Sequence, residues 1–302
     1  MIFTIMVIAL LSFFLIAYSG YEIIKDRSPI EKRINTLNSF VSSVETDIPR
    51  HLYISGYRTI FIMQQYTIDK YSYITDFDNS LEEIFFNGTL YGEHKSLMDD
   101  GKFSDILESL NNNAEKINAE VQMLNPSISV EQLDPWNLQF NLNITLIITD
   151  KSNLASWNRT DSFNATVPIA TFVDPIYSVE TSGKVTNEIT KSPFANFSST
   201  DYSNLISHFQ NSYYIASTSA PSFLNRLVGN FSNNEFGIES IVYPQNLANV
   251  DLSVKHKSLI DYIYFSDNNF QNYEISPISN LILDNQNNHL EIYNVTSVAV
   301  PI

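Results

Sequence analysis

The sequence predicts an α+β protein, in which an amino-terminal transmembrane or stalk helix and further helices precede a mainly antiparallel, β-rich head. Three observations carry this prediction. Residues 1–21 contain no charged side chain. Apolar residues then recur every three or four positions through much of the first 124 residues, which is the spacing of one helix face. From residue 136 the period changes to two, which is typical of a strand with one covered face.

The opening stretch, residues 1–21, is predicted to be a retained transmembrane or filament-core helix. At about 1.5 Å per helical residue it spans about 31 Å, close to the hydrocarbon thickness of a bilayer. The alternatives are a cleaved secretory signal, with Ala17 and Ser19 at the cleavage point, and a buried core helix. No Lys or Arg precedes the apolar run, which disfavours the signal. The side chains expected to insert or bundle are Ile2, Phe3, Ile5, Met6, Val7, Ile8, Leu10, Leu11, Phe13, Phe14, Leu15 and Ile16, within a span from Ile2 to Tyr18.

Four bases follow this stretch at Lys25, Arg27, Lys32 and Arg33. By the positive-inside tendency they favour a cytoplasmic location for that end of the helix. We nevertheless expect the remainder of the chain outside the cytoplasm. One hypothesis reconciles the two: the orienting basic residues lay in a leader that has been removed. Mass spectrometry of the precursor tests it, because a precursor in which no residue precedes Met1 would reject it.

A helical stalk is expected next, because apolar residues from Ile30 to Leu52 keep the spacing of one helix face. Pro49 lies inside this pattern and removes a helical hydrogen bond, so a kink or break is expected there. Residues 53–73 are then predicted to form a second helix that packs back with an aromatic face.

Two more helices are predicted at residues 78–86, where Ser80 and Glu83 have capping-box spacing, and at residues 103–124. The predicted organisation therefore has three parts. They are a transmembrane or filament-core helix at 1–21, a helical stalk and subdomain at 22–125, and a β-rich extracytoplasmic domain at 126–302 with a helical insert near 202–229.

The clearest strand runs from Trp136 to Thr149, where apolar residues alternate with amide and hydroxyl residues. Residues 163–169 repeat the alternation. The Asp134-Pro135 and Asp174-Pro175 dipeptides are expected to begin turns. Further strands are predicted at residues 238–243, 259–265, 280–283 and 290–295.

Composition excludes several classes of protein. The 33 acids against 17 bases give a formal charge of −16, which opposes nucleic acid. The absence of Cys removes disulfides, thiol catalysis and thiolate metal sites. The 8 glycines form no Gly-x-Gly and no phosphate-binding loop, so the usual ATP and dinucleotide enzymes are excluded. The acids are mostly distal, since residues 1–60 hold 6 bases and 5 acids.

Candidate sites for chemistry are weak throughout the chain. The acids from Asp76 to Glu83 resemble calcium ligands but are better explained as helix-capping residues, and the amide-rich run 284–289 is better explained as a turn. The five histidines have no metal spacing, and nucleophile motifs are missing. Several tyrosines are candidates for a sugar-binding surface or, more simply, for the core: Tyr213, Tyr214, Tyr262, Tyr264 and Tyr273. We therefore expect no catalytic residue, metal or cofactor.

Asn-x-Ser/Thr sequons are candidate N-glycosylation sites of an exported chain, although their number is close to that expected by chance from this composition. They lie at Asn87, Asn143, Asn158, Asn164, Asn196, Asn230 and Asn294. All seven follow the membrane-proximal region, as expected for a distal exposed domain.

Several phrases of the sequence resemble archaeal cell-surface proteins with a pilin-like hydrophobic amino-terminal helix of the class III signal peptide type. The phrases are SFVSSVETDIPRHLYISGYR (39–58), DPWNLQFNLNITLIITD (134–150), SAPSFLNRLVGNF (219–231), FGIESIV (236–242), LIDYIYF (259–265) and HLEIYNV (289–295). The resemblance implies a membrane-embedded or filament-forming first helix and an extracytoplasmic head without an assigned reaction. Two features depart from the pattern: no basic leader precedes the apolar run, and Ile5 replaces the acid that many bacterial type IV pilins carry there.

The function expected from these features is non-enzymatic. The leading hypothesis is a pilin-like subunit or membrane-anchored component of a surface filament, located in the cell membrane with an extracytoplasmic domain or in an extracellular filament. Its partners would be membrane lipid, copies of itself, or both, with a further envelope or surface partner. The alternative is a singly anchored adhesin or receptor for an envelope glycan or surface protein. A third hypothesis, an exported carbohydrate-active enzyme, requires two carboxylates about 5–10 Å apart in a cleft.

Overall fold

The computed structural model describes residues 2–302, apart from the side chains of residues 2, 4 and 19–28. It contains two compact units, each described by itself below. Unit 1 comprises Met1–His51, Phe103–Ser127 and Asn143–Phe163; unit 2 comprises Leu52–Lys102, Ile128–Leu142 and Asn164–Ile302. The expected α+β class with antiparallel sheets is confirmed.

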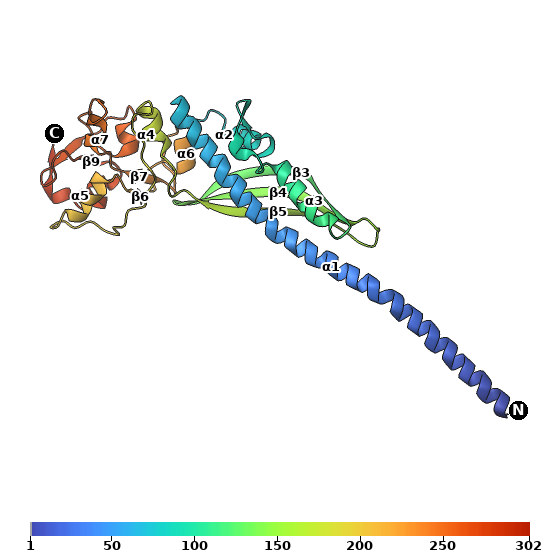
Figure 1. The fold of residues 1–302 in the computed structure, drawn as a ribbon. Helices are drawn as coiled ribbons and strands as arrows, with labels where there is room; N and C mark the ends of the chain where they lie inside the picture. Colours follow the sequence, from blue (N-terminus) through green and yellow to red (C-terminus); the bar gives the residue numbers. More distant parts are fainter. Residues whose placement is uncertain (1) are drawn as a thin grey trace. The chain divides into compact units, whose positions relative to one another are not determined.

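Helix α1 (Ile2–Lys70) is one continuous helix of 69 residues (Figure 1). The break expected at Pro49 and the separate helix expected over 53–73 are therefore wrong. One face of the helix is buried on both sides of the proline, through Val44 and Ile48 before it and Leu52 after it. Burial of this face stabilises the helix and offsets the backbone hydrogen bond that the proline removes.

A three-stranded sheet supplies strands to both units. Its order is β3-β4-β5, formed by β3 (Ala119–Asp134), β4 (Asn137–Asp150) and β5 (Ser156–Pro168). The connections between these strands are too short for parallel crossovers, so the neighbours are antiparallel. The prediction of β4 is confirmed, because its even-numbered residues are buried from Leu138 to Asp150.

Strand β3 corrects the predicted helix over 103–124. Helix α3 (Phe103–Glu115) ends earlier, and the chain is extended from Ala119 onward. Within β3 the buried parity changes from odd at Met123 to even at Ile128, next to Asn125 with φ +50°. An extra residue inserted in this way is a β-bulge, and it interrupts the alternation that would reveal a strand.

Unit 1 packs α1 and α3 against its part of the sheet. The Asn111 side chain of α3 donates to the Val121 carbonyl and accepts from the Val121 N–H, each at 2.9 Å. On α1, Arg33 pairs with Asp150 at 2.5 Å and Glu45 with Arg159 at 2.6 Å. The hydrogen bond from Arg33 lowers the pKa of the buried Asp150.

The first part of unit 2 is a small helical and hairpin region. Its elements are α2 (Phe77–Glu82), a π-helical turn (Glu83–Asn87), β1 (Thr89–Leu90), β2 (Glu93–His94), a 3-10 turn (Ser96–Met98) and the end of α1. The expected capping box of Ser80 and Glu83 is wrong, because Asp76 caps α2 by accepting from the Asn79 N–H. Glu83 instead accepts from the Gly92 N–H at 2.7 Å and holds the hairpin turn.

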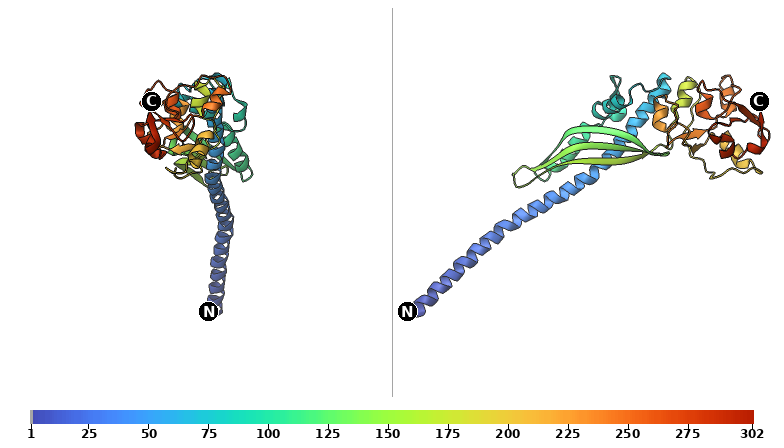
Figure 2. Two further views of the ribbon diagram at one scale, coloured as in Figure 1. Left: turned by 90° about the vertical axis from the view of Figure 1, so that its left-hand side faces the viewer. Right: turned by 180° about the vertical axis from the view of Figure 1, so that it is seen from behind.

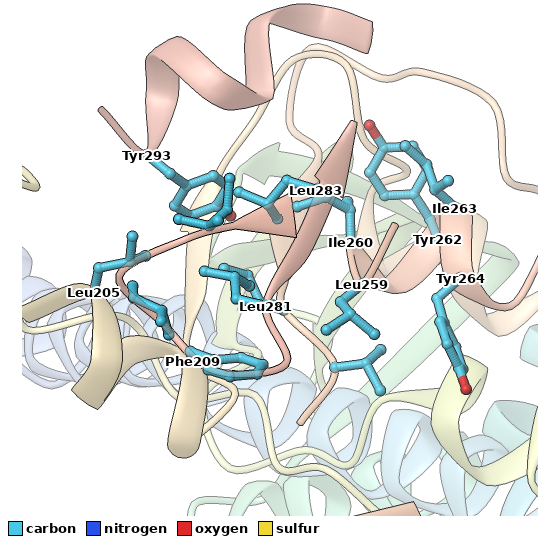
Figure 3. Packing of buried hydrophobic residues seen from close by; sticks show 14 of the residues in the cluster. Leu205, Phe209, Leu259, Ile260, Tyr262, Ile263, Tyr264, Leu281, Leu283 and Tyr293 are labelled. Carbon is cyan, nitrogen blue, oxygen red and sulfur yellow. The ribbon is translucent and has the colours of Figure 1, made fainter. Parts of the chain in front are cut away.

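The remainder of unit 2 consists of short elements around one apolar cluster. They are α4 (Pro175–Glu180), α5 (Ser203–Gln210), β6 (Tyr214–Ala216), α6 (Phe223–Leu227), β7 (Ile238–Ser240), α7 (Pro244–Ala248), α8 (Asp261–Tyr264), β8 (Asn272–Ile275), β9 (Ile282–Asp284), a 3-10 turn (Gln286–Asn288), α9 (His289–Ile292), a 3-10 turn (Thr296–Val298) and β10 (Ala299–Pro301). The sheets are β6-β7 and β10-β8-β9. In the cluster, Phe209, Leu259 and Tyr293 come from three different segments (Figure 3).

Several local predictions in this region are corrected. The strands expected at 259–265 and 290–295 contain the short helices α8 and α9, and the helix expected at 202–229 is divided by β6. Asp174-Pro175 begins α4 rather than a turn, since the Asp174 side chain accepts from the Ile176 N–H at 2.9 Å.

Candidate functional site

The apolar amino-terminal part of α1 is the most exposed apolar region that the structure describes. No other element lies beside it in any view (Figures 1 and 2). Its described large side chains are 41–79% exposed: Phe3, Ile5, Met6, Val7, Ile8, Leu10, Leu11, Phe13, Phe14, Leu15, Ile16 and Tyr18. Because they include consecutive positions, they point to every side of the helix rather than along one stripe. A helix that is apolar all round is normally buried in lipid or protein.

The polar groups of this segment are satisfied within the helix. Its backbone forms the regular helical ladder, and the Ser12 hydroxyl donates to the Ile8 carbonyl at 2.8 Å. A segment entering an environment without water must satisfy its polar groups internally. The segment therefore meets this requirement at its backbone and at Ser12.

A search for membrane spans covered only the described residues, and within them no helix combines the length and apolar character that crossing a bilayer requires. The expected span at 1–21 extends outside that description, because it includes Met1 and the side chains of residues 2, 4 and 19–21. The role assigned to Ile2 thus lies outside the described residues.

The sequence-predicted chemical sites do not assemble into one centre. Asp76 acts as a helix cap, and in the described part of the chain no cluster of three His or acidic side chains is arranged to hold a metal. Of the candidate sugar-binding tyrosines, Tyr214, Tyr262 and Tyr264 are buried and belong to the core. The sequon asparagines are exposed at all seven positions, from Asn87 to Asn294.

Unit 2 contains a buried ionic cluster that sequence reasoning missed. Arg226 on α6 is fully buried, and its Nη1 atom lies 2.5 Å from Asp174 and 2.9 Å from Asp261. Tyr214 donates to Asp174 at 2.7 Å, and Ser240 donates to Asp261 through its N–H and hydroxyl. Burial raises the pKa of Asp261 even though Arg226 opposes this effect. These residues come from different segments, so no local motif identifies the cluster.

A second buried cluster surrounds His289 on α9. Its Nδ1 atom lies 2.9 Å from Asp284 and its Nε2 atom 3.5 Å from Glu239, whose other oxygen accepts from the Tyr293 hydroxyl. Burial disfavours the protonated imidazole, but Asp284 and Glu239 outweigh burial and raise the pKa of His289 to about 10. Burial likewise raises the pKa of Glu239, but hydrogen bonding and attraction from His289 reverse the sign and lower it. Both clusters are closed inside unit 2 and serve its stability.

The His289 cluster predicts a loss of stability at alkaline pH. The pKa of His289 is raised from 6.5 to about 10 by folding, so its contribution is complete below pH 6.5 and disappears as the pH rises through 10. We expect the free energy of unfolding to fall by a few kcal/mol between pH 7 and pH 10.5, as measured by urea denaturation. His289→Gln should flatten this alkaline limb, whereas the exposed control His256→Gln should retain it. An unchanged limb in His289→Gln would contradict the assignment.

Comparisons with known proteins add no relative. No protein-family model, no curated protein and no solved structure matches the chain. The functional argument therefore depends on the physical properties of the segments described above.

Proposed function

We propose that this chain is a non-enzymatic surface protein of the pilin-like archaeal type that its sequence resembles. In this proposal the amino-terminal part of α1 is held in the membrane or bundled with copies of itself, and the acidic head lies outside the cytoplasm. The observation that carries the proposal is the exposure of apolar side chains on every side of the segment from Phe3 to Tyr18.

The energetic argument is the cost of leaving this segment in water. Full burial of one large apolar side chain contributes about 1.5–3 kcal/mol, so exposure of the whole segment costs on the order of 20 kcal/mol. This exceeds the net stability of a typical domain. Lipid or identical helices can remove the cost, since both offer apolar surface on all sides of the helix.

The rest of α1 supports a mechanical role for the helix. In unit 1, Leu37, Val44 and Ile48 are fully buried, and Arg33 is bonded both to Asp150 and to the Asn118 carbonyl. The helix that carries the apolar segment is thus built into a folded unit without an intervening loop. A load on the segment would be transmitted directly to that unit.

Electron microscopy and fractionation of the full-length chain test the proposal. We expect it to sediment with membranes and to resist carbonate extraction, and negative-stain images of native cells or purified protein should show helical filaments that contain it. Detergent-dependent monomers without filaments would favour the alternative, a singly anchored adhesin or receptor. Recovery in the carbonate-soluble fraction would reject both.

A further inference from the structure

Unit 2 contains an open cleft of about 940 Å³, here called the Trp136 cleft. It lies among the turn between β3 and β4, the segment before α5, strand β6 and the end of α9. The residues that carry the argument are Trp136, Lys191, Phe194, Asn196, Glu291 and Asn294. Its volume is within the range of small-molecule sites, which combine aromatic surface with a few polar groups that fix orientation.

Two elements of the cleft wall are positioned by specific bonds. Asp134 accepts from the Trp136 N–H at 2.7 Å, and the Lys191 ammonium lies 5.3 Å from the centroid of the indole ring. On the opposite segment, the Asn294 carboxamide donates to the Phe197 carbonyl at 3.0 Å. An indole, an ammonium and an amide are therefore held in place before any ligand binds.

The polar groups of the cleft belong to side chains rather than to a free strand edge. Strand β6 is paired with β7 on one side. On its other side, Tyr214 donates to the Thr190 carbonyl at 2.9 Å and accepts from the Ser192 N–H at 2.8 Å. A peptide binding by strand addition would need such backbone groups to be available. The cleft is therefore poorly suited to an extended peptide.

Charge disfavours phosphorylated and other strongly anionic ligands. Lys191 faces the same cleft as Glu291, and unit 2 contains 22 acids against 9 bases. The surrounding field thus repels anions and leaves the cleft without net positive charge. A neutral ligand with many hydroxyl groups and apolar ring faces matches the amides, the two opposite charges and the indole.

We propose that the Trp136 cleft binds a neutral oligosaccharide. One sugar ring lies with its C–H face against Trp136 or Phe194, and its hydroxyl groups bond to Lys191, Asn196 and Glu291. Glycans attached at Asn196 or Asn294 would occupy the mouth of the same cleft, so the test requires the unglycosylated chain. This site is separate from the apolar segment, and its binding does not depend on filament assembly.

Trp136 makes the test direct, because the chain contains only one other tryptophan, Trp157 in unit 1. Full-length Trp157→Phe in lipid nanodiscs, which avoid sugar-headed detergents, is titrated with tetrasaccharides of N-acetylglucosamine, mannose and glucose. We expect a saturable emission change with at least one probe at micromolar to millimolar concentration, confirmed by calorimetry. The matched Trp136→Phe chain, which retains Trp157, should show no emission change.

Two further variants keep the test sharp. Trp136→Ala should raise the Kd about tenfold or more, and the exposed Asn196→Ala, which carries little folding risk, should raise it severalfold. The exposed control Asn233→Ala should bind as the unmodified chain does. The proposal is overturned if no probe gives saturable binding at millimolar concentration. It is equally overturned if Trp136→Ala and Asn196→Ala both bind with unchanged affinity.

Discussion

Replacing Leu11 and Phe14 by arginine should release the chain from membranes and from assemblies. Both side chains are exposed, at 59% and 63%, and both lie near the middle of the apolar segment. An arginine at the centre of a membrane helix costs about 2.5–3.5 kcal/mol on insertion scales, and two cations repel in a helix bundle. We expect the double variant to move from the carbonate-resistant pellet to the soluble fraction, with loss of any filaments.

The matched control for this variant is Asn38→Arg with Ser42→Arg, two exposed positions on the packed part of α1. These changes add the same charge outside the apolar segment, so the chain should remain in the pellet. Circular dichroism should show folded protein in both cases. Retention of the Leu11/Phe14 variant in the pellet would contradict the assigned role of the segment.

Arg226→Met should be the most destabilising single substitution that leaves the shape of the core similar. It removes the cation but leaves Asp174 and Asp261 buried near each other, with the Ile238 carbonyl deprived of its guanidinium donor. Breaking a buried ion pair from one side typically costs 3–5 kcal/mol. We expect the midpoint of urea denaturation at pH 7 to fall accordingly.

Arg50→Met is the control, because its side chain is 74% exposed and pairs with Asp47 at the surface of α1. Exposed pairs contribute about 0–1 kcal/mol, so this variant should unfold close to the unmodified chain. Equal effects of the two substitutions would show that the Arg226 cluster contributes no more than a surface pair.

The elements that could be predicted are those whose local pattern is also their packing pattern. Strand β4 alternates strictly because one face is covered, so its bounds were found almost to the residue. Helix α1 was recognised by its apolar face but divided wrongly at Pro49. Proline predicts a local cost, whereas the buried face formed by Val44, Ile48 and Leu52 belongs to tertiary packing.

The elements that could not be predicted lack a usable period. The bulge at Asn125 reverses the alternation of β3, and its first residues therefore extended the helical pattern of α3. Helix α8 is buried throughout, from Asp261 to Tyr264, and a short apolar run of this kind does not distinguish a strand from a helix. The Arg226 and His289 clusters join residues far apart in the sequence, which a single chain without an alignment does not reveal.

The central claim is that the segment from Phe3 to Tyr18 cannot remain exposed to water. Sedimentation-velocity analysis of the purified full-length chain, with and without detergent, tests this claim most directly. We predict monodisperse protein only in the presence of detergent or lipid, and filaments or large assemblies after its removal. A detergent-free chain that sediments as a single folded monomer would contradict the account.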